Sequence, residues 1–461
     1  ARFLTEQIAG DEAYPGNMEA LTGTGFCRNG PSNDNNVKPP QREQYRLDQL
    51  DDVLSTTTSV FLGLTIGCAR CHEHKSEPIS QEDYYRVLAV FNTGGPREYL
   101  ISGATQQKGK KKKAPAIRSF QDAGNKARPT HVLFRGEAKA KGAAVQPAAP
   151  SALSAIPFPA PSPPEGMKTT GLRHSLAQWM TSEKHPLTWR VIANRLWLHH
   201  LGRGIVASPS NLGTSGSPPS HPELLDHLAS RLLLHNGHLK PLHRYMLTSA
   251  TYRQGSAWSE KDLGRSGEFE LYARFTPRRL EAEAIRDSIL QASGNLNLRM
   301  GGPGIKPRID PSILARSKRN EWPLVKKETH VHWRRSSYIY VKRQLLMPML
   351  ELFDAPTTSV SCELRARSTV PTQALTLLNN PFVNEQATHL ARLGKDSIAR
   401  LLENALGRPA EPGMLAESKA FIRERERVYA DNGRDAEKAQ FMARTDLCVV
   451  LFNSSRFLYI D

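Results

Sequence analysis

The chain of 461 residues has few cysteines, and it has no long hydrophobic run. Setting aside the closely spaced pair Cys68 and Cys71, the five cysteines leave an odd remainder, which excludes a disulfide framework. No apolar stretch approaches the roughly 20 residues of a membrane-spanning helix, so we expect no membrane span in this chain. Acidic residues are also in the minority: 45 Asp and Glu stand against 62 Lys and Arg, which gives a net charge of +17.

The positive net charge raises the question of a nucleic-acid partner. Residues 108–113 form the only dense basic run, in a polar stretch without aromatic residues, and the other basic residues are spread over expected helices. No helix-turn-helix or aromatic stacking motif accompanies them. We therefore interpret the run as a solvated, mobile insertion and expect no nucleic-acid partner. A basic surface also suits an acidic redox partner protein or an anionic polysaccharide.

The most informative stretch is Cys68-Ala69-Arg70-Cys71-His72, because this spacing is the attachment signature of c-type haem. Each thiol can form a thioether to one vinyl group of the porphyrin, and the following histidine is placed as the proximal iron ligand. The sequence thus predicts one covalent haem c, with Cys68 and Cys71 as cofactor-binding residues and His72 as the metal ligand. It indicates neither the distal ligand nor a catalytic residue.

Two other interpretations of the motif stay open. Cys68, Cys71, His72 and His74 carry the ligand atoms of a zinc site, although structural zinc sites usually take their second pair of ligands from a distant segment. A disulfide or a thioredoxin-like redox pair between the two thiols is the other, but that motif needs a preceding strand. The preceding residues 48–64 instead have the apolar periodicity of a helix.

The surrounding pattern predicts a mainly helical protein. Ser80 and Asp83 have the spacing of a capping box at the start of a second helix, which ends before Gly94, so the motif lies between two helices. Residues 98–170 are rich in Lys, Ala and Pro and are expected to form a linker with one short strand over 131–136. From residue 171 onward we expect helices, among them one capped by Ser220 with Glu223, one over 276–294, and two over 371–378 and 382–393. One strand is predicted over 337–341.

Several segments resemble a known pair of domains. Residues 63–75, 78–79 and 83–85 resemble the cytochrome-c-like domain of unknown function of large planctomycete secreted proteins. The later chain resembles the planctomycete-specific domain that follows it, in residues 194–204, 219–225, 248–254, 353–356, 371–380 and 451–459. The resemblance covers nearly the whole chain, without the N-terminal part of the first domain, and the basic run at 108–113 is peculiar to this chain.

This resemblance implies a cytochrome-c-like helical domain over residues 1–97 that is incomplete at its N-terminus. After the linker, it implies a larger, mostly helical planctomycete-specific domain over 171–461. Family members resemble exported proteins, often encoded near sulfatase-like proteins, which implies a periplasmic or extracellular location at the cell envelope and a role in processing polysaccharides. The chain begins inside an expected helix, so we expect a processed or partial product, and the lack of a signal peptide does not argue against export.

The expected function is electron transfer, with the chain as the redox component of a carbohydrate-processing oxidoreductase. The alternative is a non-catalytic binding or scaffold protein of the cell envelope with a structural haem or metal site. Whether the chain is an enzyme stays open.

Polar residues of the second domain are interpreted as mainly structural. In residues 194–203 we expect Trp197 to be a core residue and Arg195 and Arg203 to form salt bridges to Glu223 or Asp226. Asp354 is expected to pair with Arg365 or Arg367 and so fix a loop. A glycan hydrolase would need two carboxylates across a cleft, whereas the acidic residues of one expected helix are more simply a solvated face: Glu281, Glu283 and Asp287.

Overall fold

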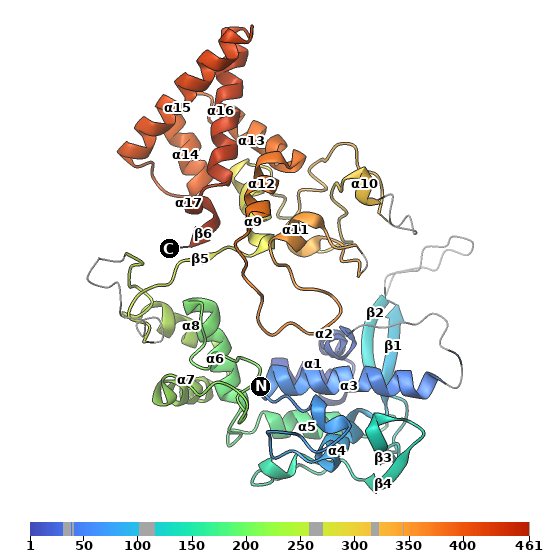
Figure 1. Ribbon diagram of the computed structural model, residues 1–461. Coiled ribbons are helices and arrows are strands. Elements are labelled where there is room, and N and C mark those ends of the chain that lie inside the picture. The colour runs from blue at the N-terminus through green and yellow to red at the C-terminus, as the bar shows by residue number, and fades with distance from the viewer. Residues whose placement is uncertain are drawn as a thin grey trace. The chain divides into compact units, whose positions relative to one another are not determined.

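The structure, a computed structural model, describes residues 1–30, 38, 41–100, 116–257, 271–314, 322–343 and 345–460. These residues are mainly helical, with three small antiparallel sheets of two strands each (Figure 1). The prediction of a mainly α fold with few strands is confirmed. Within these ranges, no helix combines the length and apolarity of a membrane span. The predicted insertion at 108–113 lies outside the described residues.

The chain divides into two compact units. The first consists of Ala1–Thr276 with Ser359–Glu363, and the second of Pro277–Thr358 with Leu364–Asp461. This division differs from the predicted boundaries at residues 97 and 170. The described residues 116–170, expected as a linker, belong to the first unit and supply the buried side chains of Phe120, Leu133 and Val145 to its core. A composition rich in proline indicates that helices are absent, but it does not indicate that packing is absent.

The first unit begins with helices of different lengths and continues through two strand pairs into four more helices. Its elements are α1 (Arg2–Ala13), α2 (Met18–Gly23), η1 (Thr24–Arg28), α3 (Arg42–Phe61), η3 (Gly67–Arg70), α4 (Gln81–Phe91), β1 (Gly94–Leu100), β2 (Ala116–Asp122), β3 (Thr130–Leu133), η4 (Phe134–Gly136), β4 (Lys141–Val145), η5 (Ser151–Leu153), α5 (Leu172–Met180), α6 (Thr188–Leu201), α7 (Pro222–Leu234) and α8 (Leu239–Leu247). One apolar cluster joins α1, α3, α4 and α5, and a second joins α6, α7 and α8.

A buried ionic cluster around Arg173 connects separate segments of the first unit. The guanidinium is fully buried and donates two hydrogen bonds of 2.8 Å to Asp11, while Glu12 and Asp122 lie at 3.1 and 3.3 Å. These carboxylates come from α1 and β2, and Arg173 from α5, so one side chain joins three segments that are distant in sequence. Burial raises the pKa of Glu12, and this effect outweighs the attraction of Arg173.

The second unit is a helical assembly around one apolar core. Its elements are β5 (Arg278–Arg279), α9 (Ala282–Ala292), α10 (Pro311–Leu314), η7 (Ser336–Tyr338), α11 (Pro348–Leu352), α12 (Pro371–Asn379), α13 (Pro381–Leu393), α14 (Ile398–Leu406), α15 (Pro412–Asp431), α16 (Ala436–Phe452), α17 (Ser455–Leu458) and β6 (Tyr459–Ile460). Helices α15 and α16 form a long antiparallel hairpin, visible in red in Figure 1.

Local signals predicted several helix ends. The helix predicted over 276–294 forms only over Ala282–Ala292, because Arg278–Arg279 belong to the strand β5. The capping box of Ser80 and Asp83 at α4 is confirmed, whereas α7 is preceded by His221 as its N-cap and Ser220 does not cap it. The strand predicted over 337–341 is wrong: η7 occupies its start. Only Ile339 forms a bridge, with Ile305. Aromatic and β-branched residues favour a strand only where a neighbouring strand supplies partners along its length, and here the contact is limited to one residue pair.

Candidate functional site

The motif residues lie on the 3-10 helix η3 and on the turn that follows it. Cys68 and Cys71 are exposed free thiols, and His72 is also exposed. Ala69, between the two cysteines, is fully buried, and Ile66 just before them is 1% exposed. The turn is therefore anchored in the core through its small apolar residues, while all three predicted cofactor-binding side chains face solvent.

Arg70 holds the motif against the two flanking helices. Its guanidinium forms ion pairs with Asp48 and with Asp51, both on α3, and the second pair measures 3.2 Å. Its carbonyl oxygen accepts hydrogen bonds from the α4 side chains Tyr85, at 2.9 Å, and Gln81, at 3.1 Å. Burial alone would lower the pKa of Arg70, but the two carboxylates outweigh it and raise this pKa. The turn is thus fixed by side-chain and backbone contacts that leave the thiols free.

His72 has a geometry that suits a metal ligand. Its Nδ1 lies 2.6 Å from the carbonyl oxygen of Glu73. Because a carbonyl oxygen only accepts hydrogen bonds, this contact places a proton on Nδ1, and in the neutral imidazole Nε2 then carries the lone pair. Metal-ligating histidines commonly donate their second ring N–H to a carbonyl group in this way, which fixes the tautomer and the ring orientation.

His74, by contrast, is engaged within its own loop. Its Nδ1 accepts hydrogen bonds from the backbone amides of Ser76, at 3.2 Å, and Glu77, at 2.9 Å. That nitrogen closes a turn and has no lone pair left for a metal in this conformation. Across the described ranges, no group of three or more His, Cys, Asp or Glu side chains is arranged to hold a metal ion.

The loop of residues 208–217, which is distant in sequence, binds Glu77, five residues after His72. The buried carboxylate of Glu77 accepts hydrogen bonds from the amides of Thr214, at 2.9 Å, and Ser215, at 3.0 Å. Burial would raise the pKa of Glu77, but these hydrogen bonds outweigh it and lower the pKa. Gly213 lies so close that a Cβ there would be 2.4 Å from the Glu77 carboxylate, so only glycine fits. Nothing in the local motif pointed to this contact.

The polar residues predicted on α6 are mainly structural. Asn194 is fully buried and exchanges two 2.9 Å hydrogen bonds with the backbone of Val206. Trp197 is a core residue, as predicted, and packs edge-on against Tyr272. Arg195 donates to the carbonyl oxygen of Ser59, at 3.1 Å, and to Ser210 Oγ, at 2.9 Å.

The partner predicted for Asp226 is wrong, because its carboxylate pairs with Arg190 at 2.5 Å. Sequence reasoning also missed the contact of 2.7 Å between Nε2 of His200 on α6 and Nδ1 of His243 on α8.

The carboxylates predicted in the second unit are held by arginines. Asp354 pairs with Arg279 and accepts hydrogen bonds from Ser368, so the predicted pairing with Arg365 or Arg367 is wrong. Its loop-fixing role is the predicted one, with a partner that lies 75 residues away in sequence.

Arg365 instead bridges Glu283, at 2.6 Å, and Glu281, at 3.2 Å. Asp287 accepts hydrogen bonds from the amide and hydroxyl of Ser336, at 2.8 and 2.6 Å. These three carboxylates are therefore partnered, and their side chains stay partly solvated, with Glu281 51%, Glu283 30% and Asp287 23% exposed.

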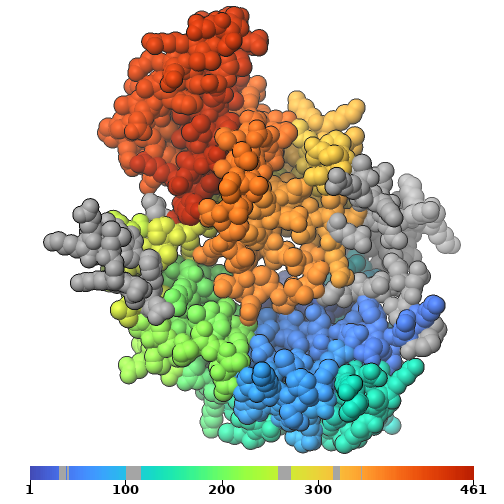
Figure 2. Space-filling model, in the orientation of Figure 1, coloured from blue at the N-terminus to red at the C-terminus, as the bar shows by residue number. Residues whose placement is uncertain are grey.

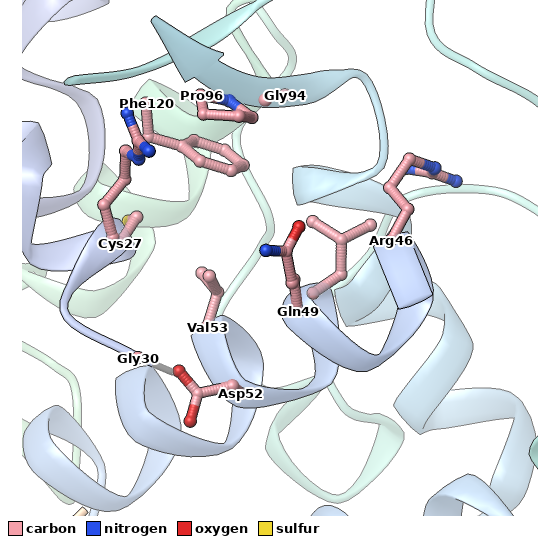
Figure 3. Close-up of a pocket in the computed structure, with 12 residues that line it drawn as sticks. Cys27, Gly30, Arg46, Gln49, Asp52, Val53, Gly94, Pro96 and Phe120 are labelled. Atoms are coloured by element: carbon pink, nitrogen blue, oxygen red, sulfur yellow. The ribbon is translucent and has the colours of Figure 1, made fainter. Parts of the chain in front are cut away.

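A separate small pocket lies between η1, α3 and the β1–β2 hairpin, all in the first unit. Figure 3 shows Asp52 beneath Gly30, with Gln49 and Arg46 on the same helix and Phe120 at the far wall. Burial raises the pKa of Asp52, and the neighbouring Asp51 raises it further. The pocket has a volume of about 100 Å³, enough for about three water molecules and too small for a macrocycle. No residue of the Cys68–His72 motif lines it.

Comparison with known proteins shows the family. The family model PSD1, described as a protein of unknown function (DUF1553), matches residues 172–422, which is more than half of the chain, and the chain belongs to this family. The family model PSCyt2, also described as a protein of unknown function (DUF1549), matches residues 1–94. The expected pairing of two domains is therefore confirmed, and neither description assigns a cofactor or an activity. Searches of curated proteins and of solved structures found no match.

Proposed function

We propose that this PSD1 family member is an exported electron-transfer protein with one covalent c-type haem, bound through Cys68 and Cys71 and ligated by His72. The observation that supports the proposal is the exposure of all three side chains on one anchored turn. A thiol buried in the core could not reach a porphyrin vinyl group, and a disulfide would leave no thiol to react. Both motif cysteines are accessible and unpaired.

The residues of the turn fit the group in their chemistry. When bound, a c-type haem supplies an iron that gains or loses one electron. His72 would hold that iron through Nε2, because its Nδ1 is fixed on the Glu73 carbonyl. The ion pairs of Arg70 and the buried Ala69 keep the two thiols and the imidazole on one rigid turn. Such a turn preorganises three attachment points.

The position of the turn favours electron transfer over a buried structural role. The exposed thiols would hold a haem at the protein surface, where a partner protein can approach it. The net charge of +17 suits an acidic redox partner, or an anionic polysaccharide near which the protein works. Covalent attachment, together with the resemblance to exported proteins, supports a periplasmic or extracellular location at the cell envelope. We further propose that the electrons serve the oxidation of carbohydrate.

The test is a visible spectrum of the full chain, produced in a host that attaches c-type haem, with a pyridine haemochrome assay after acid–acetone extraction. We expect a c-type α-band that stays with the protein. Cys68→Ala and Cys71→Ala should each remove one thioether, and the double variant should lose the haem on extraction. His72→Ala should change the spin state of the iron. Cys362→Ala is the matched control, because Cys362 is an exposed free cysteine outside the motif.

Two results would contradict the proposal. If the wild-type chain carries no haem and elemental analysis finds a bound metal, the motif is a metal site, and the envelope scaffold becomes the better explanation. If the double cysteine variant retains haem as firmly as Cys362→Ala does, the haem is attached elsewhere.

A further inference from the structure

The turn η4 between β3 and β4 has a strained backbone beside the motif. Arg135 has a φ of 52° and Gly136 a φ of 73°, so two consecutive residues adopt the left-handed conformation. Glycine does so without cost, but a side chain with a Cβ is disfavoured there. Backbone strain of this kind persists only where the surrounding structure holds it, and it is concentrated at functional sites.

Side chains from both flanking helices hold this turn in place. Gln44 of α3 donates to the carbonyl oxygen of Gly136, at 3.2 Å, and accepts from the amide of Ala138, at 2.9 Å. Gln81 of α4 donates to the carbonyl oxygen of Leu133, at 3.1 Å, and also to that of Arg70 in the motif, at 3.1 Å. One glutamine therefore joins the turn and the motif directly.

The turn also lies against the motif cysteine. A Cβ added to Gly136 would be 3.0 Å from Nε of Arg70 and 3.4 Å from Sγ of Cys71. In Figure 2, the segment of α4 (blue) and the segment of β3 and β4 (teal) lie side by side at the surface. Because residue 136 is a glycine, no side chain of the turn covers the Cys71 thiol at this position.

The two residues before this glycine carry exposed side chains. Phe134 is 67% exposed, and the guanidinium of Arg135 lies over its ring, with the Cζ atom 5.4 Å from the ring centroid. Two residues of chain span at most about 7 Å, so the backbone of Phe134 lies within about 7 Å of the glycine that faces Cys71. A large aromatic side chain that is left in solvent, on a turn fixed by strain and by two glutamines, is not explained by packing in the core.

We propose that Phe134 and Arg135 form one wall of the haem site. Phe134 covers the apolar macrocycle, and Arg135 pairs with a propionate carboxylate. This inference rests on the proposed function and adds two positioning residues that the motif does not contain. A haem has apolar faces and two anionic propionates, and an exposed aromatic ring with a neighbouring guanidinium is complementary to both. The Arg135 guanidinium lies over the Phe134 ring, so the two side chains are neighbours on this turn.

The experiment compares Phe134→Ala and Arg135→Gln with wild type in the full chain carrying haem. We expect the amount of covalent haem, measured by the haemochrome assay, to stay unchanged. The midpoint potential should fall in both variants, because Phe134→Ala admits water and Arg135→Gln removes a positive charge that favours the reduced iron. Matched controls are Phe3→Ala, which alters an aromatic side chain that is 70% exposed, and Arg118→Gln, which alters an arginine that is 74% exposed.

A second variant protects the test against misfolding. Arg135→Gly keeps the left-handed backbone without strain and removes the guanidinium, so it should fold at least as well as wild type and still lower the potential. If the wild-type chain carries no haem, the proposed function and this inference both fail. If haem is attached and the three variants have the potential of the controls, only this inference is overturned.

Discussion

The buried cluster around Arg173 and the turn that carries Cys68, Cys71 and His72 both belong to the first unit. They differ in burial, in bonding and in how far apart their residues lie in sequence. Around Arg173, charged side chains are buried together and bonded to one another, and they come from segments far apart in sequence. At Cys68, Cys71 and His72, the chemically reactive side chains come from one turn and face solvent, while the buried Ala69 and the ion pairs of Arg70 anchor the turn.

The difference in burial predicts which property a substitution in each cluster changes. A buried charge that loses its partner costs folding free energy, because its desolvation is no longer compensated. An exposed thiol that is replaced by alanine removes chemistry and little packing. Changes in the Arg173 cluster should therefore alter stability, and changes in the motif should alter cofactor attachment.

The largest effect is expected for Arg173→Met. Methionine fills part of the volume but leaves Asp11, Glu12 and Asp122 without their cation, so we expect a loss of about 3–5 kcal/mol in the free energy of unfolding. Urea unfolding monitored by circular dichroism measures this loss. Arg190→Met is the control, because Arg190 and Asp226 are 37% and 53% exposed in their side chains. Such a pair contributes about 1 kcal/mol or less. Equal losses in both variants would show that burial does not distinguish the Arg173 cluster.

An intermediate effect is expected for Arg70→Met, because Arg70 is less buried than Arg173 and less exposed than the motif thiols. Its side chain is 18% exposed and pairs with Asp48 and Asp51. We expect a loss of about 1–3 kcal/mol in the same unfolding measurement, from charge-assisted hydrogen bonds that are partly screened by solvent. The yield of covalent haem per folded chain should fall as well, because Arg70 fixes the turn that carries the thiols. An unchanged yield would mean that the backbone contacts of the turn suffice.

The sequence predicted local features better than long-range ones, and the two clusters illustrate why. The Cys68–His72 spacing and the capping box at Ser80 are contained within a few residues, so a pattern in the chain specifies them. Arg173 pairs with Asp11 on α1, 162 positions away, and with Asp122 on β2, 51 positions away, and no spacing rule specifies such contacts. The wrong partners predicted for Asp226 and Asp354 have the same cause.

The division into compact units also depends on contacts that no local pattern specifies. The PSD1 match begins at residue 172, yet residues 172–276 belong to the same compact unit as the PSCyt2 match at 1–94. Composition placed a linker at 98–170, but Phe120 and Asp122 within that range pack and bond inside the unit. Family boundaries follow the sequence pattern, whereas a compact unit follows burial, and here one buried arginine at position 173 connects both matched regions.

A pH dependence of stability should follow from Glu12, whose pKa is raised by burial. Between the unfolded value near 4.5 and the higher folded value, the folded state binds more protons, so the free energy of unfolding falls as pH rises through this window. The slope contributed by one proton is at most about 1.4 kcal/mol per pH unit. Glu12→Gln should remove this contribution, so that wild type loses stability relative to the variant as pH rises.

The difference between the two unfolding curves as a function of pH is the quantity to measure. Glu12→Gln also loses one acceptor oxygen, because Thr169 and the amide of His174 donate to different oxygens of the carboxylate. That loss lowers the stability of the variant, so the slope of the difference with pH is the diagnostic quantity. Parallel curves would mean that Glu12 titrates normally and that the buried cluster tolerates the extra negative charge.

The smallest effect on stability is expected for the two motif thiols, in Cys68→Ala and Cys71→Ala of the protein produced without haem. Both thiols are exposed and unpaired, so each replacement should change the free energy of unfolding by about 0.5 kcal/mol or less. Cys448→Ser is the contrast: this cysteine is fully buried in the core of the second unit, and a hydroxyl without a partner there should cost about 1–3 kcal/mol. If the motif variants lost as much as Cys448→Ser, the thiols would hold the fold together through a metal or a disulfide, and the separation between the two clusters would fail at the motif itself.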